Sequence, residues 1–211
     1  MKIITTLAVV DPDKCSGCKT CYAICPVLAI RMENRKAVID EGHCFGCNNC
    51  EQRCPEYAIT MVSRSEPRVV EIHVNRFHPD AILDLCISAK FHPEQVVCFC
   101  TGTRAGEIAA AIMDGAKTPE EVSLKTGART GCKVLCIAPI LRLLYAAGIT
   151  PQKPDGIQWC GNTPTLWDIS AETMAKYASH GFCFDLDKNF LEANLAYELG
   201  KGENCKCQKR P

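Results

Sequence analysis

The sequence predicts an α+β protein made of a small mixed unit, a small all-α domain and an irregular C-terminal extension. The first observation is a duplicated cysteine motif, CSGCKTCYAICP at 15–26 and CFGCNNCEQRCP at 44–55, whose copies flank two β-prone runs. The second is a further cysteine set, spread over 98–136, that alternates with helical patterns. The third is a remainder with four more cysteines and two amphipathic helix candidates. We therefore expect four parts, at 1–63, 64–95, 96–148 and 149–211, of which the second is a connector.

The cysteine content favours one of two protein classes. Seventeen cysteines in 211 residues suit a secreted protein with a disulfide framework, or a protein that binds metal through thiolates in a reducing compartment. The segment MKIITTLAVVDPDKC lacks the apolar core and the cleavage site of a secretory signal. An odd number of cysteines fits poorly with complete pairing, and no uncharged apolar stretch is long enough to cross a membrane. We therefore expect a cytoplasmic, metal-binding chain with no membrane partner.

The charged residues balance, with 24 Lys and Arg against 24 Asp and Glu. This balance gives no electrostatic basis for binding nucleic acid or an anionic membrane surface. The chain also lacks a strand-linked GxGxxG, a P-loop, a GxSxG and an HExxH motif. We therefore expect a chain that does not transform an organic substrate by itself.

The two motif copies indicate a duplicated structural unit. An offset of 29 residues aligns four cysteines and extends to the apolar segments PVLAI (26–30) and PEYAI (55–59). Between the copies, IRMENRKAVID has two β-prone runs around the polar turn ENRK, which predicts a hairpin, and the leader IITTLAV predicts another strand. The aligned pairs are Cys15 with Cys44, Cys18 with Cys47, Cys21 with Cys50, and Cys25 with Cys54.

The spacing of these cysteines suits iron–sulfur chemistry. Three cysteines at two-residue intervals on a tight loop can converge on three corners of a [4Fe–4S] cube, while the fourth, followed by Pro, ligates the other cluster. The expected ligands are Cys15, Cys18, Cys21 and Cys54 for the first cluster, and Cys44, Cys47, Cys50 and Cys25 for the second. Residues 1–63 resemble the bacterial two-cluster ferredoxin family, with all eight ligands and both prolines in place. Zinc, which also favours Cys-x₂-Cys pairs, is the alternative metal.

The second cysteine set lies among three expected helices. The segments EIAAAIMDG and TPEEVSLKTG predict two of them, the latter with a capping box, and KVLCIAPILRLLYAAG predicts a third, with Pro139 in its first turn or at a kink. Cys132 and Cys136 are four residues apart, so on a helix they would share one face. The complete set is Cys98, Cys100, Cys132 and Cys136.

Residues 96–148 resemble the [2Fe–2S] domain of the bacterioferritin-associated-ferredoxin-like family. The resemblance includes the Cys-x-Cys pair, the GAKTPEEV turn and the TGARTGC segment, although the last cysteine pair is spaced by three residues where some members have two. It implies one [2Fe–2S] cluster on the four cysteines of this set and a flavoprotein as the usual partner. Tetrahedral zinc on the same cysteines is the alternative.

The remaining cysteines carry weaker signals. Cys86 lies on the apolar face of the helix candidate DAILDLCISAKF and is expected in the core, after a short strand at VVEIHV. His43, beside Cys44, is expected to be a solvated loop residue. The terminal Cys-x-Cys permits a further zinc or iron site in the extension, which otherwise reads as a partner-docking segment. That candidate site comprises Cys160, Cys183, Cys205 and Cys207.

Together these expectations favour a non-catalytic electron-transfer subunit of a larger oxidoreductase. Its clusters would relay single electrons between a flavin-containing oxidoreductase subunit and a low-potential carrier, such as a soluble ferredoxin. One alternative is a freestanding polyferredoxin, although such carriers are usually strongly acidic. Another is a redox sensor or metallochaperone, which would transfer a metal ion or a cluster to an acceptor.

Overall fold

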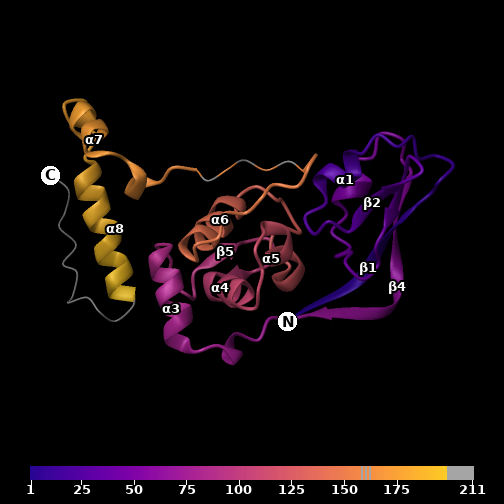
Figure 1. Ribbon diagram of the computed structural model, residues 1–211, viewed down its shortest axis with the longest axis horizontal. Helices are drawn as coiled ribbons and strands as arrows, with labels where there is room; N and C mark the ends of the chain where they lie inside the picture. Colours follow the sequence, from indigo (N-terminus) through magenta and orange to yellow (C-terminus); the bar gives the residue numbers. More distant parts are fainter. Residues whose placement is uncertain (158, 160, 162, 199–211) are drawn as a thin grey trace.

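The computed structural model describes residues 1–157, 159, 161 and 163–198. Its elements form three groups along the longest axis: a strand-rich N-terminal domain, a central group of helices and a pair of C-terminal helices (Figure 1). The N-terminus lies where the first two groups meet (Figure 1). The order of a mixed domain followed by a helical one is the α+β architecture that the sequence predicts.

The N-terminal domain is framed by two long strands. β1 (Lys2–Val10) pairs antiparallel with β4 (Ile59–Val70), with Lys2 opposite Val70 and Val10 opposite Ile59. The register shifts between Ile4 and Thr6, as in a β-bulge, which increases the local twist of a strand pair. The predicted leader strand is confirmed, and Ile4, on its inner face, belongs to the apolar core of this domain.

A hairpin lies between the motif copies, as the sequence predicts. β2 (Ile30–Glu33) pairs with β3 (Lys36–Ile39). The two residues between the strands, Asn34 and Arg35, have φ of 46° and 62°. Two successive residues with positive φ give the turn whose twist matches that of the flanking strands.

Each motif copy ends in a short helix. α1 (Thr20–Ile24) follows Lys19, whose φ is 64°, and α2 (Asn49–Gln52) follows Asn48, whose φ is 62°. These two residues occupy the same place in the two copies. The duplication of sequence is therefore also a duplication of backbone conformation.

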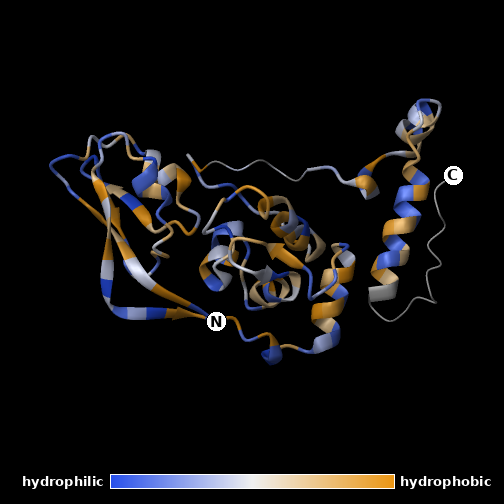
Figure 2. Cartoon of the chain, turned by 180° about the vertical axis from the view of Figure 1, so that it is seen from behind, coloured by the Kyte–Doolittle hydropathy of each residue, from blue (hydrophilic) through white to orange (hydrophobic). Residues whose placement is uncertain are grey.

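The helical domain is built around α4 (Ala105–Met113). Its alanines are completely buried, and such small side chains let neighbouring helices approach closely. Against α4 pack α3 (Pro79–Ser88), α5 (Pro119–Thr126) and α6 (Ile137–Ala146). Figure 2 shows much of α3 and α6 in hydrophobic colours and α5 in more hydrophilic ones. A two-stranded pair, β5 (Val96–Cys98) with β6 (Thr103–Arg104), closes it beside α4.

The predicted connector, 64–95, contains the end of β4, the 3₁₀ helix η1 (Val74–Arg76) and α3. Of the expected strand VVEIHV, only the first two residues lie in β4. Cys86, on α3, is fully buried in the core of the helical domain, which confirms its expected place. The helix of this segment is therefore part of the central fold.

The start and end of α5 follow the predicted capping chemistry. The Thr118 hydroxyl accepts a hydrogen bond of 3.2 Å from the backbone N–H of Glu121, and Pro119 is the first helical residue. Gly127, with φ of 75°, ends the helix. A left-handed residue at this place suits glycine, which has no Cβ.

The expectation that Cys132 and Cys136 share a helix is wrong. α6 begins at Ile137, with Cys136 as its N-cap, and Cys132 lies in the preceding loop. The cause is local, because Lys133 has φ of 64°, a left-handed conformation that interrupts a right-handed helix. Pro139 falls in the first turn of α6, where its missing N–H costs nothing.

The C-terminal extension first runs from α6 to the N-terminal domain and then turns back toward the C-terminal helices (Figure 1). Gly156 lies near Tyr22 of the N-terminal domain, and the chain then returns to η2 (Leu166–Asp168), α7 (Ala171–Ala178) and α8 (Phe184–Glu198) (Figure 1). The Trp167 indole N–H donates to Glu192 at 3.2 Å, which ties η2 to α8. Of the helices in the described part of the chain, none has both the length and the apolar composition needed to span a membrane.

Candidate metal centres

The first cysteine tetrad lines one cavity of the N-terminal domain. Three of its cysteines come from the first motif copy and the fourth from the second copy. The apolar wall of the cavity includes Met32 and Ile59. The four cysteines are Cys15, Cys18, Cys21 and Cys54. The structure therefore brings together the set that sequence spacing assigns to one [4Fe–4S] cluster.

The second tetrad lines a separate cavity with the reverse composition. It takes three cysteines from the second copy and one from the first, beside Phe45 and Ile39. The four are Cys25, Cys44, Cys47 and Cys50. Because Cys21 lies in the short helix α1 and Cys25 is the C-cap of the same helix, one element supplies both cavities and holds them next to each other.

Backbone amides point at the cysteine that each copy contributes to the opposite tetrad. The N–H of Ala29 donates to Cys25 Sγ at 3.2 Å, and the N–H of Ala58 donates to Cys54 Sγ at 3.3 Å. Hydrogen bonds to ligand sulfurs stabilise the more negative, reduced form of an iron–sulfur site. The two tetrads therefore carry equivalent backbone support.

Glycine is required in both motif loops. Gly17 and Gly46 have φ of 77° and 60°. A Cβ at Gly17 would lie 2.2 Å from the carbonyl oxygen of Arg35, and one at Gly46 would lie 2.3 Å from Thr6 Oγ1. Both loops are therefore closed against neighbouring backbone, which keeps their cysteines turned inward.

Burial makes several thiols of these tetrads hard to ionise without a metal. It raises the pKa of Cys21 to about 11 and that of Cys50 to about 12. Thiolates are the metal-binding form, so occupation of the cavities by iron would release protons. The donor set, four thiols around an apolar cavity, fits a thiolate-bound cluster.

The third tetrad lies in the helical domain and divides into two pairs. Cys98, at the end of β5, is hydrogen-bonded to Cys136, and both are buried. Cys100 and Cys132 are exposed, and the N–H of Cys132 donates to Cys100 Sγ at 3.4 Å. A [2Fe–2S] cluster takes two protein ligands on each iron, so two close cysteine pairs suit it.

Hydrogen bonds perturb the buried pair strongly. The contact with Cys136, helped by donors at Thr101 and the backbone of Arg129, lowers the pKa of Cys98 to about 5. The same contact, together with burial, raises the pKa of Cys136. The contact therefore favours the thiolate of Cys98 and the protonated thiol of Cys136.

A buried ion pair supports the loop that carries Cys132. Arg129 Nη1 lies 2.9 Å from Glu120 Oε1, and the two side chains are 2% and 1% exposed. Glu120 is in the first turn of α5, so the pair fastens the cluster loop to that helix. Arg129 itself has φ of 67°, and its backbone amide contacts Cys98.

Of the other predicted site residues, the structure describes Cys183 and His43. Cys183 is exposed, and Cys160, Cys205 and Cys207 lie outside the described residues. His43 is exposed, and its Nδ1 lies 3.2 Å from Asp40 Oδ2. Within the ranges that the structure describes, no three His, Cys, Asp or Glu side chains are grouped as a single metal ion requires.

Side chains between the tetrads carry no sequence signal of their own. Asn49 Nδ2 donates to Cys47 Sγ at 3.3 Å and to the carbonyl oxygen of Gly131 at 3.4 Å. The Lys133 ammonium donates to the carbonyl oxygen of Ile24, and burial lowers the pKa of that lysine. Only the spacing around the cysteines could have drawn attention to these positions.

Comparison with known families agrees with this geometry. Residues 7–55 match the 4Fe-4S dicluster domain, and residues 96–146 match the BFD-like [2Fe-2S] binding domain. The search gave no matching curated protein and no matching solved structure. The chain thus joins two iron–sulfur electron-transfer domains, which confirms the predicted two-domain resemblance and supports a general role as an electron carrier.

Proposed function

Since a 4Fe–4S dicluster domain and a BFD-like [2Fe–2S] domain share this chain, we propose that it is the electron-transfer subunit of a flavin-containing oxidoreductase. It would relay single electrons between a flavoprotein and a low-potential carrier such as a soluble ferredoxin. The observation that carries the proposal is that three cysteine tetrads lie in domains joined by direct hydrogen bonds near their ligands. When bound, two [4Fe–4S] clusters and one [2Fe–2S] cluster would supply one-electron redox chemistry.

The flavoprotein end of the relay is assigned to the [2Fe–2S] tetrad. Phe99, between two ligands, is 75% exposed, and Val134 and Leu135 in the ligand loop are also exposed. Apolar side chains around the exposed pair Cys100 and Cys132 offer a surface that a partner can bury. Docking there would exclude water between the cluster site and a flavin.

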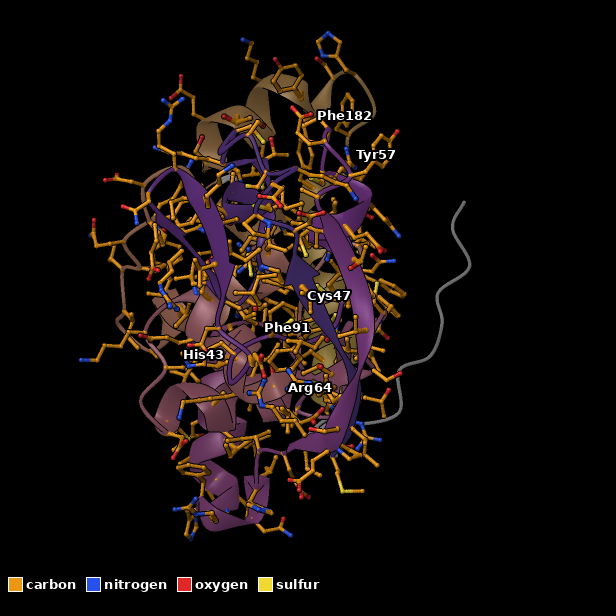
Figure 3. All side chains as sticks on the ribbon, turned by 90° about the vertical axis from the view of Figure 1, so that its right-hand side faces the viewer. His43, Cys47, Tyr57, Arg64, Phe91 and Phe182 are labelled. Atoms are coloured by element: carbon orange, nitrogen blue, oxygen red, sulfur yellow. The ribbon has the colours of Figure 1, made fainter. Side chains whose placement is uncertain are left out.

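The carrier end is assigned to the first tetrad. Cys18 is exposed, and Tyr57, which follows Cys54, is 83% exposed. Figure 3 shows Tyr57 at the upper margin of the N-terminal domain, with Cys47 nearer the middle of the view. A small carrier could therefore approach the first tetrad without displacing the helical domain.

The C-terminal helices supply a third surface for docking. Leu186, Phe190 and Leu191 of α8 are exposed, as is Phe182 in the turn before it. Apolar side chains of this kind gather where a chain meets a partner subunit. The candidate metal site at Cys160, Cys183, Cys205 and Cys207 belongs to the same segment and is tested by the iron count below.

The test is anaerobic purification from the native host, followed by iron and sulfide analysis and EPR spectroscopy before and after dithionite. About ten irons per chain, with signals of both cluster types and a stoichiometric flavoprotein, support the proposal. About eight irons with bound zinc would overturn the assignment of the helical domain. Appreciably more than about ten would place iron in the C-terminal segment. Recovery of a monomer without flavoprotein would favour a freestanding carrier.

A further inference from the structure

The N-terminal and helical domains meet beside the second tetrad. The side-chain amide of Asn49 bridges Cys47 Sγ, at 3.3 Å, and the carbonyl oxygen of Gly131, at 3.4 Å. Gly131 and Cys132 share one peptide group, and the N–H of that group donates to Cys100 Sγ at 3.4 Å. A continuous chain of hydrogen bonds therefore links a sulfur of the second tetrad to a sulfur of the third.

Packing around the bridge fixes the two domains in this position. The Lys133 ammonium donates to the carbonyl oxygen of Ile24, the residue before Cys25. A Cβ at Gly131 would lie 2.8 Å from Cys100 Sγ, so the peptide that accepts from Asn49 is pressed against the ligand. The backbone at Gly131 thus contacts both the N-terminal domain, through Asn49, and the third tetrad, through Cys100.

The sister motif lacks this bridge. Thr20 occupies the position of Asn49 in the first copy, and its hydroxyl lies 3.4 Å from Cys18 Sγ, the sulfur that corresponds to Cys47. Cys18 is exposed. The two copies therefore share a polar contact to the ligand sulfur, and the longer amide of Asn49 adds the contact to the other domain.

We propose that the three centres act in a fixed linear order, with the second tetrad in the middle, and that Asn49 is the residue that couples it to the third. This inference rests on the proposed electron-transfer function. Each transfer at this junction moves one electron: the centre on one side is oxidised, the centre on the other is reduced, and no covalent bond changes. The first tetrad exchanges electrons with the third through the second.

Three substitutions in the full-length, cluster-loaded chain separate the two contacts of Asn49. Asn49→Ala removes both contacts. Asn49→Thr keeps a hydroxyl near Cys47 Sγ and removes the bridge to Gly131, and the backbone accepts it because the sister motif has Thr there. Thr20→Ala removes the matched sulfur contact at the first tetrad and serves as the control.

The measurements are iron content, the reduction potential of each centre, the magnetic interaction between the reduced second and third centres by EPR, and the rate of electron transfer between them after flash reduction. Both Asn49 variants should keep their iron, weaken the magnetic interaction and slow this transfer. Only Asn49→Ala should lower the potential of the second centre, by about fivefold in its reduction equilibrium or about 40 mV, because one net hydrogen bond to sulfur is lost. Thr20→Ala should leave this transfer unchanged.

The coupling role of Asn49 would be overturned if Asn49→Thr kept the wild-type rate of electron transfer between the second and third centres. It would also be overturned if Thr20→Ala slowed that transfer as much as the Asn49 variants do. Such a result with three reducible centres present would leave the relay itself intact. Absence of a reducible third centre in the unmodified chain would instead refute the proposed function, so the two failures are distinguishable.

Discussion

Replacing Glu120 with Gln is expected to destabilise the helical domain sharply, because it leaves Arg129 charged and buried. The two side chains are 1% and 2% exposed, so the pair belongs to the buried class, whose disruption costs about 3–5 kcal/mol. Glu120 Oε2 and Arg129 Nε have no hydrogen-bond partner within the described residues, so one contact of 2.9 Å joins the groups. We therefore expect the lower end of the range, about 3 kcal/mol.

Urea unfolding of the anaerobic, cluster-loaded protein measures this loss. If the unfolding free energy falls by about 2 kcal/mol per molar urea, a loss of about 3 kcal/mol of stability lowers the urea midpoint by about 1.5 M. Far-UV circular dichroism reports the helices, and visible absorbance reports the cluster that the Arg129 loop holds. Both signals should be lost at lower urea in the Glu120→Gln variant.

A matched surface pair provides the control. Asp114, the C-cap of α4, and Lys125 of α5 form an ion pair at 2.5 Å, but both side chains are 34% exposed. Asp114→Asn should cost less than about 1 kcal/mol, because water screens the pair. A double change, Glu120→Met with Arg129→Met, should recover most of the stability, since it removes both buried charges. A Glu120→Gln midpoint equal to that of Asp114→Asn would refute the reasoning.

One chemical modification and two further substitutions test the remaining local features. At about pH 8 Cys86 should resist iodoacetamide in the native protein, because burial raises the pKa of its thiol to about 12 and the thiolate is the reactive form; rapid alkylation would contradict this. Gly46→Ala should lower the iron content by about four per chain, since a Cβ would lie 2.3 Å from Thr6 Oγ1, whereas Gly42→Ala should retain the iron. Thr118→Ala should lower the unfolding free energy by about 1 kcal/mol through loss of the α5 cap, and an unchanged thermal midpoint would argue against the cap.

Local chemistry made much of the fold predictable. The hairpin at Asn34 and Arg35, the cap at Thr118 and the buried place of Cys86 each follow from a short segment of sequence. The grouping of the cysteines was predictable because ligand spacing on a tight loop admits few geometries. In these cases neighbouring residues determine the outcome.

The conformation of one loop residue and long-range packing decided what the sequence did not predict. Helical periodicity around Cys132 suggested a helix that starts there. The left-handed backbone at Lys133 interrupts it, so α6 begins only at Ile137, after Cys136. The ion pair between Glu120 and Arg129 depends on the fold of the loop after α5. Asn49 and Gly131 are 82 residues apart, and only the docking of two domains brings them together.

The duplicated motif explains both the likeness and the difference of its two halves. Because α1 carries Cys21 to one cavity and Cys25 to the other, the two centres are adjacent whatever surrounds them. A third centre attached to one side can contact only one half, so the two halves face different surroundings. Thr20 suits the half that faces solvent, where its hydroxyl reaches only its own sulfur. Asn49 suits the half that faces the helical domain, where one more hydrogen bond spans the boundary. The cysteine ligands of the two motif copies are equivalent. If electrons pass in the proposed order, the difference between Thr20 and Asn49 therefore determines which of the two [4Fe–4S] centres couples to the third centre.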